Sequence, residues 1–201
     1  MNTMSAEQIG VSYENVRVNL ELSWRFYQMS EVINNMKTRR SIRKYKPDMI
    51  PEDVLNRIIE AGTYAATGMG KQSPIIIAVT NKEIRDKFSK MNAEIMGVDS
   101  DPFYGAPVVL IVLADKARPT YVYDGSLVMG NLMLAAHAEG IGSCWIHRAK
   151  EEFEMPEWKQ WLKNLGVEGE YIGIGHCVLG YVDGDYPDTP KRKPDWVYRV
   201  R

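Results

Sequence analysis

Three short runs of apolar, mostly β-branched residues limit the fold of this chain most strongly. They cover residues 75–79, 108–113 and 177–182, and they read Ile-Ile-Ile-Ala-Val, Val-Val-Leu-Ile-Val-Leu and Cys-Val-Leu-Gly-Tyr-Val. Continuous apolar runs of this length are typical of buried strands. Because helical patterns separate the runs, we expect a layered α/β or α+β domain.

The expected helices differ in how much of their surface is apolar. One begins near Ser30, and another begins at Pro51, where proline suits the first turn, and ends near residue 62. Residues 82–96 are also expected to be helical, and a tryptophan-bearing helix precedes the third apolar run. Residues 124–139 are apolar on almost every side, which a helix tolerates only when it is covered, so we expect a central or interface helix there.

The two ends of the chain read differently from the middle. Residues 16–26 alternate between apolar and polar side chains, which suggests an extended arm or strand, with a mobile leader as an equal alternative. We therefore divide the chain into an N-terminal extension or arm, residues 1–29, and one domain, residues 30–201. The proline-punctuated tail from Asp185 is expected to be extended.

Composition excludes several classes of function. The 201 residues, 45% of them hydrophobic, can bury a full core, and a net charge of −1 argues against a nucleic-acid or anionic-membrane partner. No window reaches the roughly 20 apolar residues that span a bilayer, and there is no secretory signal, so we expect a cytoplasmic protein. Cys144 and Cys177 read as buried thiols, and the three histidines stand alone, which predicts no metal site.

Two basic clusters suit a phosphate. Arg39-Arg40-Ser41-Ile42-Arg43 places three guanidiniums and a hydroxyl within five residues, and Lys191-Arg192-Lys193 lies in the tail between two prolines. Guanidinium groups bind phosphate oxygens through paired hydrogen bonds, so the two clusters could meet on one anion. A solvated charged surface explains either cluster alone.

Two further segments suit a flat ligand. Residues 65–74, Ala-Ala-Thr-Gly-Met-Gly-Lys-Gln-Ser-Pro, are small enough to let a ligand approach the backbone, and Gln72 offers both donors and acceptors, although an ordinary turn is the alternative. In residues 139–147, Gly140 can end the preceding helix and Trp145 can flank a planar ring. The glycine spacing and the helix-before-loop order do not match a dinucleotide-binding fingerprint.

In this order, the four motifs resemble those of the nitroreductase family of FMN enzymes, over about residues 30 to 201. The resemblance implies an α+β, three-layer fold with a central, mainly antiparallel sheet flanked by helices. It also implies an intertwined homodimer that holds two tightly but non-covalently bound FMN molecules between its subunits. Carried over by position, the expected cofactor-binding residues are Arg39, Arg40, Ser41, Arg43, Ala66, Thr67, Gly68, Gly70, Gln72, Trp145, Ile146, His147, Arg192 and Lys193, with Lys191 as a register alternative to Arg192.

The resemblance divides these residues between the two subunits. It assigns the phosphate to Arg39, Ser41 and the tail cluster, while Arg40 and Arg43 line the phosphate and pyrimidine side. Residues 66–72 come from the other subunit, and residues 145–147 lie along the ring near its reactive nitrogen. Two positions depart from the family pattern, since Gly70 stands where many members have asparagine and His147 where many have glycine.

The resemblance implies a reaction in two steps. NAD(P)H passes a hydride to FMN, and an electron-poor small molecule, such as a nitroaromatic or a quinone, then takes the electrons. No protein nucleophile is required, and His147 is only a candidate proton donor, with a structural histidine as the alternative. Dehalogenation and ene reduction are alternative activities within the family. An alternative of a different class is a non-redox protein that binds or senses FMN or another phospho-ligand. Residues 82–105, with Met91, Met96, Phe103 and Tyr104, are expected to form either a flexible apolar lid over the ring or part of the core.

Overall fold

The computed structural model describes residues 31–201, which belong to two compact units, 1–38 and 39–201. In the first unit, residues 31–38 form a helix, in agreement with the helix expected from about Ser30. The arm or leader expected at residues 1–29 lies outside the described residues. Everything below concerns the second unit.

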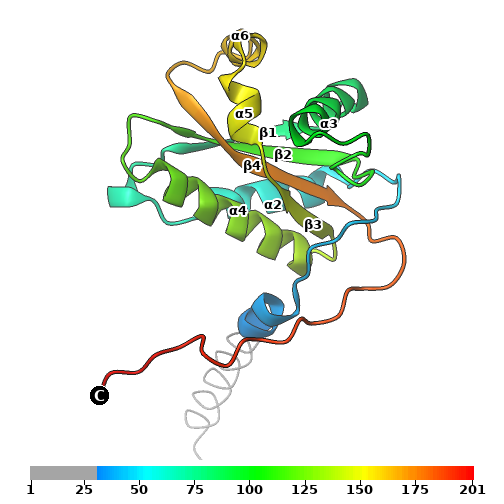
Figure 1. The fold of residues 1–201 in the computed structure, drawn as a ribbon, viewed down its shortest axis with the longest axis vertical. Coiled ribbons are helices and arrows are strands. Elements are labelled where there is room, and N and C mark those ends of the chain that lie inside the picture. Colours follow the sequence, from blue (N-terminus) through cyan, green and yellow to red (C-terminus); the bar gives the residue numbers. More distant parts are fainter. Residues whose placement is uncertain (1–30) are drawn as a thin grey trace, which may run out of the picture. The chain divides into compact units, whose positions relative to one another are not determined.

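A four-stranded antiparallel sheet forms the centre of this unit (Figure 1). Its strands are β1 (Pro74–Val79), β2 (Val108–Asp115), β3 (Gly142–Ile146) and β4 (Tyr171–Gly180), in the order β1-β2-β4-β3. In the register, Ile76 lies opposite Val112, and Leu110 lies opposite Cys177. Residues 108–114 of β2 are fully buried, so this strand is covered on both faces, as its continuous apolar run predicts.

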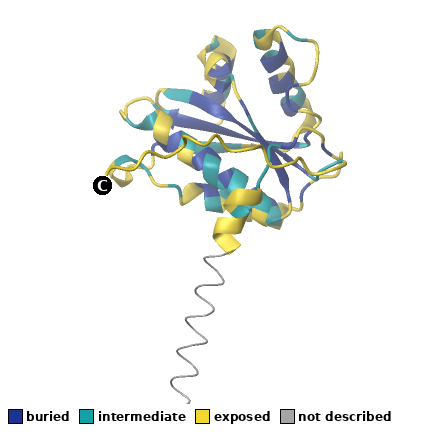
Figure 2. Cartoon of the chain, turned by 60° about the horizontal axis from the view of Figure 1, so that its bottom comes forward, coloured by how far each residue is buried: buried dark blue, intermediate teal, exposed yellow. Residues whose placement is uncertain are grey.

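Helices cover both faces of the sheet and make three layers (Figure 2). Alternate residues of β2 divide between two apolar cores. Val108, Leu110 and Val112 pack with helices α2 (Glu52–Thr63) and α4 (Tyr121–Ala138). The residues between them pack with α3 (Lys82–Met96), α5 (Ala149–Glu154) and α6 (Pro156–Asn164). The α+β class and the three-layer arrangement are therefore confirmed.

The helix ends follow local sequence rules. Pro51 precedes α2, whose first turn carries Glu52 and Asp53, where negative charge is favourable. The Asn81 side chain caps α3 by accepting a hydrogen bond from the Ile84 N–H at 3.0 Å. Gly97 ends the same helix with φ at +73°, a left-handed conformation that glycine adopts without strain.

Two strand boundaries differ from the sequence prediction. Residues 142–146, which we expected to be a loop, form the edge strand β3, and β4 begins at Tyr171 instead of residue 177. The first half of β4 was not predicted from the sequence, because glycines interrupt its apolar run. Gly173 is required there, since a Cβ at this position would lie 2.1 Å from the Ala149 carbonyl oxygen.

None of the helices within residues 31–201 is long and apolar enough to cross a membrane. In the same part of the chain, no three His, Cys, Asp or Glu side chains are grouped so that they could hold a metal ion.

Candidate active site

The first basic cluster runs in an extended segment beside β3. Ser41 forms a parallel bridge with Ser143, and the Ile42 N–H donates a hydrogen bond of 2.9 Å to the Ser143 carbonyl. Ile42 is buried in the core, and the Tyr45 hydroxyl donates to the Ile42 carbonyl at 2.8 Å. Burial raises the pKa of Tyr45, so this hydroxyl stays protonated. The bridge to β3 and the buried Ile42 and Tyr45 therefore hold in place the segment that carries Arg39, Ser41 and Arg43.

This cluster lies close to the C-terminal end of α4. Burial and then the guanidiniums of Arg39 and Arg40 lower the pKa of His137, which stands in the last turn of that helix. Tyr186, from the start of the tail, joins the same group: its hydroxyl accepts from the Arg40 N–H at 3.1 Å and lies 3.1 Å from His137 Nδ1. Sequence reasoning missed Tyr186 and His137 because nothing in the chain relates them before folding.

Arg39 of this cluster carries a buried N–H donor that no protein acceptor satisfies within the described residues. Arg39 Nη1 is buried and has no hydrogen-bond partner within the described part of the chain, and the same holds for Ser143 Oγ. A buried guanidinium N–H without an acceptor is costly unless an anion or water satisfies it. Next to the cluster, Ile42, Arg43 and Lys44 line a cavity of about 370 Å³ together with residues 182–185 and Pro187.

The small-residue segment folds into a tight loop that one buried carboxylate holds. Asp124, in the first turn of α4, accepts hydrogen bonds from the Gly68 N–H at 2.9 Å, the Ser73 hydroxyl at 2.7 Å and the Thr120 hydroxyl at 3.1 Å. Burial raises the pKa of Asp124, but these hydrogen bonds outweigh it, and the pKa lies below its ordinary value. Asp124 is therefore a charged anchor for the loop.

The loop carries an unusual number of left-handed residues. Met69, Gly70 and Gln72 have φ of 51°, 64° and 49°, and the Thr67 hydroxyl accepts from the Gln72 N–H at 3.1 Å. Left-handed conformations are uncommon for residues other than glycine, and they persist only where the surroundings impose them. Of the expected loop residues, Ala66, Gly70 and Gln72 are exposed, whereas Thr67 and Gly68 are half-buried.

The third expected segment lies at the end of β3. The half-buried Trp145 indole lies over Gly175, where a Cβ would come within 2.3 Å of the indole nitrogen, so glycine at this position makes room for the ring. Ile146 is buried, but the His147 side chain is exposed. The His147 carbonyl accepts a hydrogen bond of 2.8 Å from the Asn92 amide.

The second basic cluster lies in the exposed tail. Arg192 and Lys193 are both exposed, and the Lys193 ammonium stands 5.5 Å from the centroid of the Trp196 ring. The meeting of this cluster with residues 39–43, expected from the sequence, stays a prediction.

Two of the expected groups of site residues thus lie at opposite ends of α4. Residues 39–43 lie near His137, and the loop around Gly68 is bonded to Asp124. Thirteen residues separate Asp124 from His137, and at a rise of 1.5 Å per residue this corresponds to about 20 Å. Between the two ends, Tyr123 and Leu127 expose 72% and 50% of their surface, which is unusual for large apolar side chains on one helix face.

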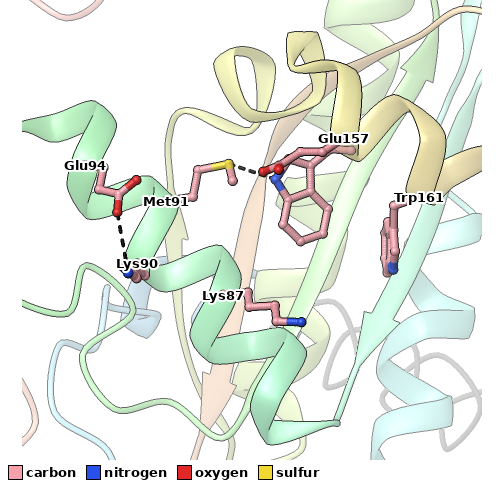
Figure 3. Close-up of a pocket in the computed structure, with 7 residues that line it drawn as sticks. Lys87, Lys90, Met91, Glu94, Glu157 and Trp161 are labelled. Carbon is pink, nitrogen blue, oxygen red and sulfur yellow. Dashed lines mark hydrogen bonds and ion pairs between the residues drawn. The ribbon is translucent and has the colours of Figure 1, made fainter.

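A larger groove lies elsewhere, between α3 and α6 (Figure 3). Its volume is about 440 Å³, and its lining consists of Lys87, Lys90, Met91, Glu94, Glu157, Trp158 and Trp161. It contains none of the expected site residues and lies on the side of the sheet that α4 does not cover. Met91 accepts a hydrogen bond from the Trp158 indole, and Phe103 is fully buried, so both residues belong to the core packing of this layer. Met96 and Tyr104 are 49% and 38% exposed, and the lid expected at residues 82–105 stays a prediction for them.

Comparisons with known proteins agree with this fold. A provisionally named NADH dehydrogenase/NAD(P)H nitroreductase of Archaeoglobus fulgidus is 27% identical over 181 residues, which cover 86% of this chain and 99% of that protein. A protein of the same name from Methanothermobacter thermautotrophicus is 29% identical over 141 residues, 66% of this chain and 68% of that protein. The crystal structure of a nitroreductase with bound FMN from Bacteroides fragilis matches with a TM-score of 0.77 and 29% identity, covering 85% of this chain and 99% of that chain.

The family itself is recognised over most of the sequence. The family model described as the nitroreductase family matches residues 36–185, a stretch that contains the whole sheet and three of the four motifs. The chain therefore belongs to the nitroreductase family.

Proposed function

We propose that this protein is an FMN-dependent oxidoreductase that takes a hydride from NAD(P)H and passes the electrons to an electron-poor small molecule, such as a nitroaromatic or a quinone. Family membership and the FMN-bound relative from Bacteroides fragilis support the cofactor. The names of the relatives support NAD(P)H as the electron donor. We assign this activity to residues 30–201 and treat residues 1–29 as an extension.

The residues at the first end of α4 fit a phosphate. Arg39 Nη1 is a buried donor in need of an acceptor, and a phosphate oxygen would satisfy it. Arg40 and the Ser41 hydroxyl belong to the same segment, and Arg192 and Lys193, which are exposed in the tail, would add positive charge. Arg43 lines the adjacent cavity, where a fixed cation favours negative charge that develops on a bound ring.

The residues at the second end fit the edge of a flat heterocycle. The Asp124-anchored loop presents an exposed Gln72 amide with both donors and an acceptor. Gly70 adopts φ of +64° with open space around its Cβ position. Asparagine tolerates this left-handed conformation better than most residues. The backbone at Gly70 therefore has a conformation that would suit the family's asparagine. In this chain, Gln72 and the backbone would supply the polar contact to the ring that the asparagine makes in other members.

The separation of the two groups is the observation that carries the proposal. Because about 20 Å of helix lies between them, one chain presents the two groups at different places. A second copy, packed with its α4 antiparallel to the first, would bring residues 39–43 of one subunit to residues 66–72 of the other. The exposed Tyr123 and Leu127 lie on the face that such a contact would bury, and two equivalent sites would result.

In the assembled site each residue has a defined task. FMN would supply the hydride transfer itself. The chain would hold the phosphate with Arg39 and Ser41, and the Trp145 indole, held over Gly175, would shield one side of the ring from water. The exposed His147 imidazole can exchange protons with solvent, so it remains the candidate proton donor to the acceptor.

Visible absorption of the purified protein tests the cofactor and the donor together. We expect flavin bands, or their appearance on titration with FMN, and bleaching by anaerobic NADH or NADPH. Bands that NADH and NADPH both leave unchanged would instead indicate a non-redox FMN sensor. A protein that stays colourless at high FMN concentration would refute the proposal.

Two variants test the construction of the site. Arg39→Ala should weaken FMN binding about 10- to 100-fold, because a charged hydrogen bond to the phosphate is lost, whereas Lys163→Ala on the exposed surface of α6 should leave it unchanged. Leu127→Glu should halve the mass measured by light scattering and abolish FMN binding at the same time. A monomeric Leu127→Glu protein with wild-type FMN affinity would show that the site does not lie between subunits.

A further inference from the structure

A chain of three buried polar side chains crosses the aromatic core between α3, α5 and β4. Asn92, Glu152 and His176 are each 0% exposed. The Asn92 amide donates to Glu152 Oε1 at 2.7 Å, and Glu152 Oε2 lies 2.8 Å from His176 Nε2. The rings of Phe88 and Phe103 lie 6.0 and 5.1 Å from the imidazole, so the group is surrounded by apolar surface.

Stability alone does not explain such a group. A buried carboxylate and imidazole lose their hydration, and well-packed apolar side chains in their place are often as stabilising or more so. What a buried polar network provides is a fixed geometry, because each member has few alternative partners. The question is therefore which part of the molecule this network holds in place.

The network ends on the backbone of His147. Besides Glu152, the Asn92 amide also donates to the His147 carbonyl, at 2.8 Å. The next residue, Arg148, has φ of +80°, a left-handed conformation that is unfavourable for arginine, and it precedes the first turn of α5. The peptide between residues 147 and 148 is thus held in a strained orientation by a hydrogen bond from one side and a helix start on the other.

We propose that Asn92, Glu152 and His176 are positioning residues of the redox site, which orient the His147–Arg148 peptide and with it the segment Trp145–His147 against the flavin ring. This inference rests on the proposed function, in which residues 145–147 lie along the ring. None of the three side chains touches substrate or cofactor. They act through the peptide, since Glu152 accepts from the Asn92 amide and so aligns it, and the His176 ring packs 2.8 Å from the second Glu152 oxygen.

The test compares two asparagines of α3 in the FMN-loaded protein. Asn92→Ala removes the hydrogen bond to His147, whereas Asn81→Ala removes the N-cap of the same helix and so weakens α3 without touching the site. We expect Asn92→Ala to shift the flavin absorption bands and the midpoint potential. It should also lower kcat with NAD(P)H about 10- to 100-fold while KM stays within about twofold, as expected for a misplaced reacting centre. Asn81→Ala should lower only the unfolding free energy of the apoprotein.

A second variant keeps the test decisive if Asn92→Ala fails to fold. Glu152→Gln preserves the volume and an oxygen for the Asn92 amide, but it replaces the oxygen beside His176 by an amide group, so the spectrum and the potential should shift in the same direction as in Asn92→Ala, by a smaller amount. A Glu152→Gln protein with wild-type spectrum, potential and kcat would show that the carboxylate takes no part in positioning, and it would overturn the proposal. An Asn92→Ala protein with wild-type spectrum, potential and kcat would overturn it as well, whereas a wild-type protein without flavin binding would refute the proposed function first.

Discussion

Replacing Asp124 by asparagine tests whether one buried carboxylate holds the candidate cofactor loop. The carboxylate is 3% exposed and accepts three hydrogen bonds, from Gly68, Ser73 and Thr120. Hydrogen bonds to a charged acceptor contribute about 1.5 to 3 kcal/mol each, and neutral ones about 1. Asparagine keeps the volume and one oxygen, and the two hydroxyls can rotate to accept from its amide. We therefore expect Asp124→Asn to lower the free energy of unfolding by about 2 to 4 kcal/mol.

Urea unfolding at several pH values measures this loss and checks its cause. The folded state lowers the pKa of Asp124, so the stabilisation by the carboxylate is present above the unfolded pKa, about 4, and is lost as the pH falls through the folded pKa. The difference between wild type and Asp124→Asn should therefore shrink below about pH 4. Asp53→Asn, at an exposed ion pair with Arg57, serves as the control and should lower the free energy of unfolding by less than about 1 kcal/mol at pH 7. A difference below about 1 kcal/mol at pH 7, or one that persists unchanged in acid, would refute the reasoning.

Three further substitutions probe how the scaffold supports the site, each measured by urea unfolding against wild type. Gly173→Ala should cost about 3 kcal/mol or more, because its Cβ would lie 2.1 Å from the Ala149 carbonyl oxygen and backbone must move; a stable variant would mean that β4 and α5 can separate easily. Arg85→Met should cost about 2 to 3 kcal/mol, since the buried guanidinium donates to Asp101 and to a backbone carbonyl, and a loss below 1 kcal/mol would contradict this role. Gly97→Ala should cost about 1 to 2 kcal/mol through its left-handed φ alone, so a neutral effect would show that α3 can end differently.

The sequence was sufficient for the parts of the fold that depend on local patterns. The runs at 75–79 and 108–113 became β1 and β2. Residues 108–113 are fully buried, as a continuous apolar run predicts, whereas β1 at the sheet edge is mostly half-buried and its Ala78 is exposed. The helix expected at 124–139 proved to be α4, and the apolar side chains that remain exposed on it agree with its assignment as a central or interface helix.

The parts that could not be predicted depend on contacts between distant residues. The edge strand β3 contains Gly142 and Ser143 and has no apolar run, so its extended form comes from pairing with β4 and from the bridge to Ser41. Asp124 was visible as an acidic residue in an apolar helix, a signal of a buried polar role, but its partners Gly68 and Ser73 lie more than 50 residues away.

The candidate site was predictable only as a set of motifs. The resemblance named the residues, but their division between the ends of α4 follows from two contacts, that of Gly68 with Asp124 and that of Arg40 with Tyr186. Neither contact has a signature in a single sequence, since a glycine, a tyrosine or an aspartate has many uses and only the fold selects one.

The placement of the two groups on one helix has an energetic consequence. If each FMN contacts residues 39–43 of one subunit and residues 66–72 of the other, then FMN binds only to the associated form, and binding and association must strengthen each other by the same free energy. FMN present at 100 times its Kd would then stabilise the assembled protein by about 2.7 kcal/mol per site. The exposed Tyr123 and Leu127 explain why this linkage is needed, because an apolar helix face is a liability in a free subunit and a binding surface in a dimer. In such a dimer, the FMN molecules would cover the two ends of α4, and the contact between subunits would cover the helix face that carries Tyr123 and Leu127.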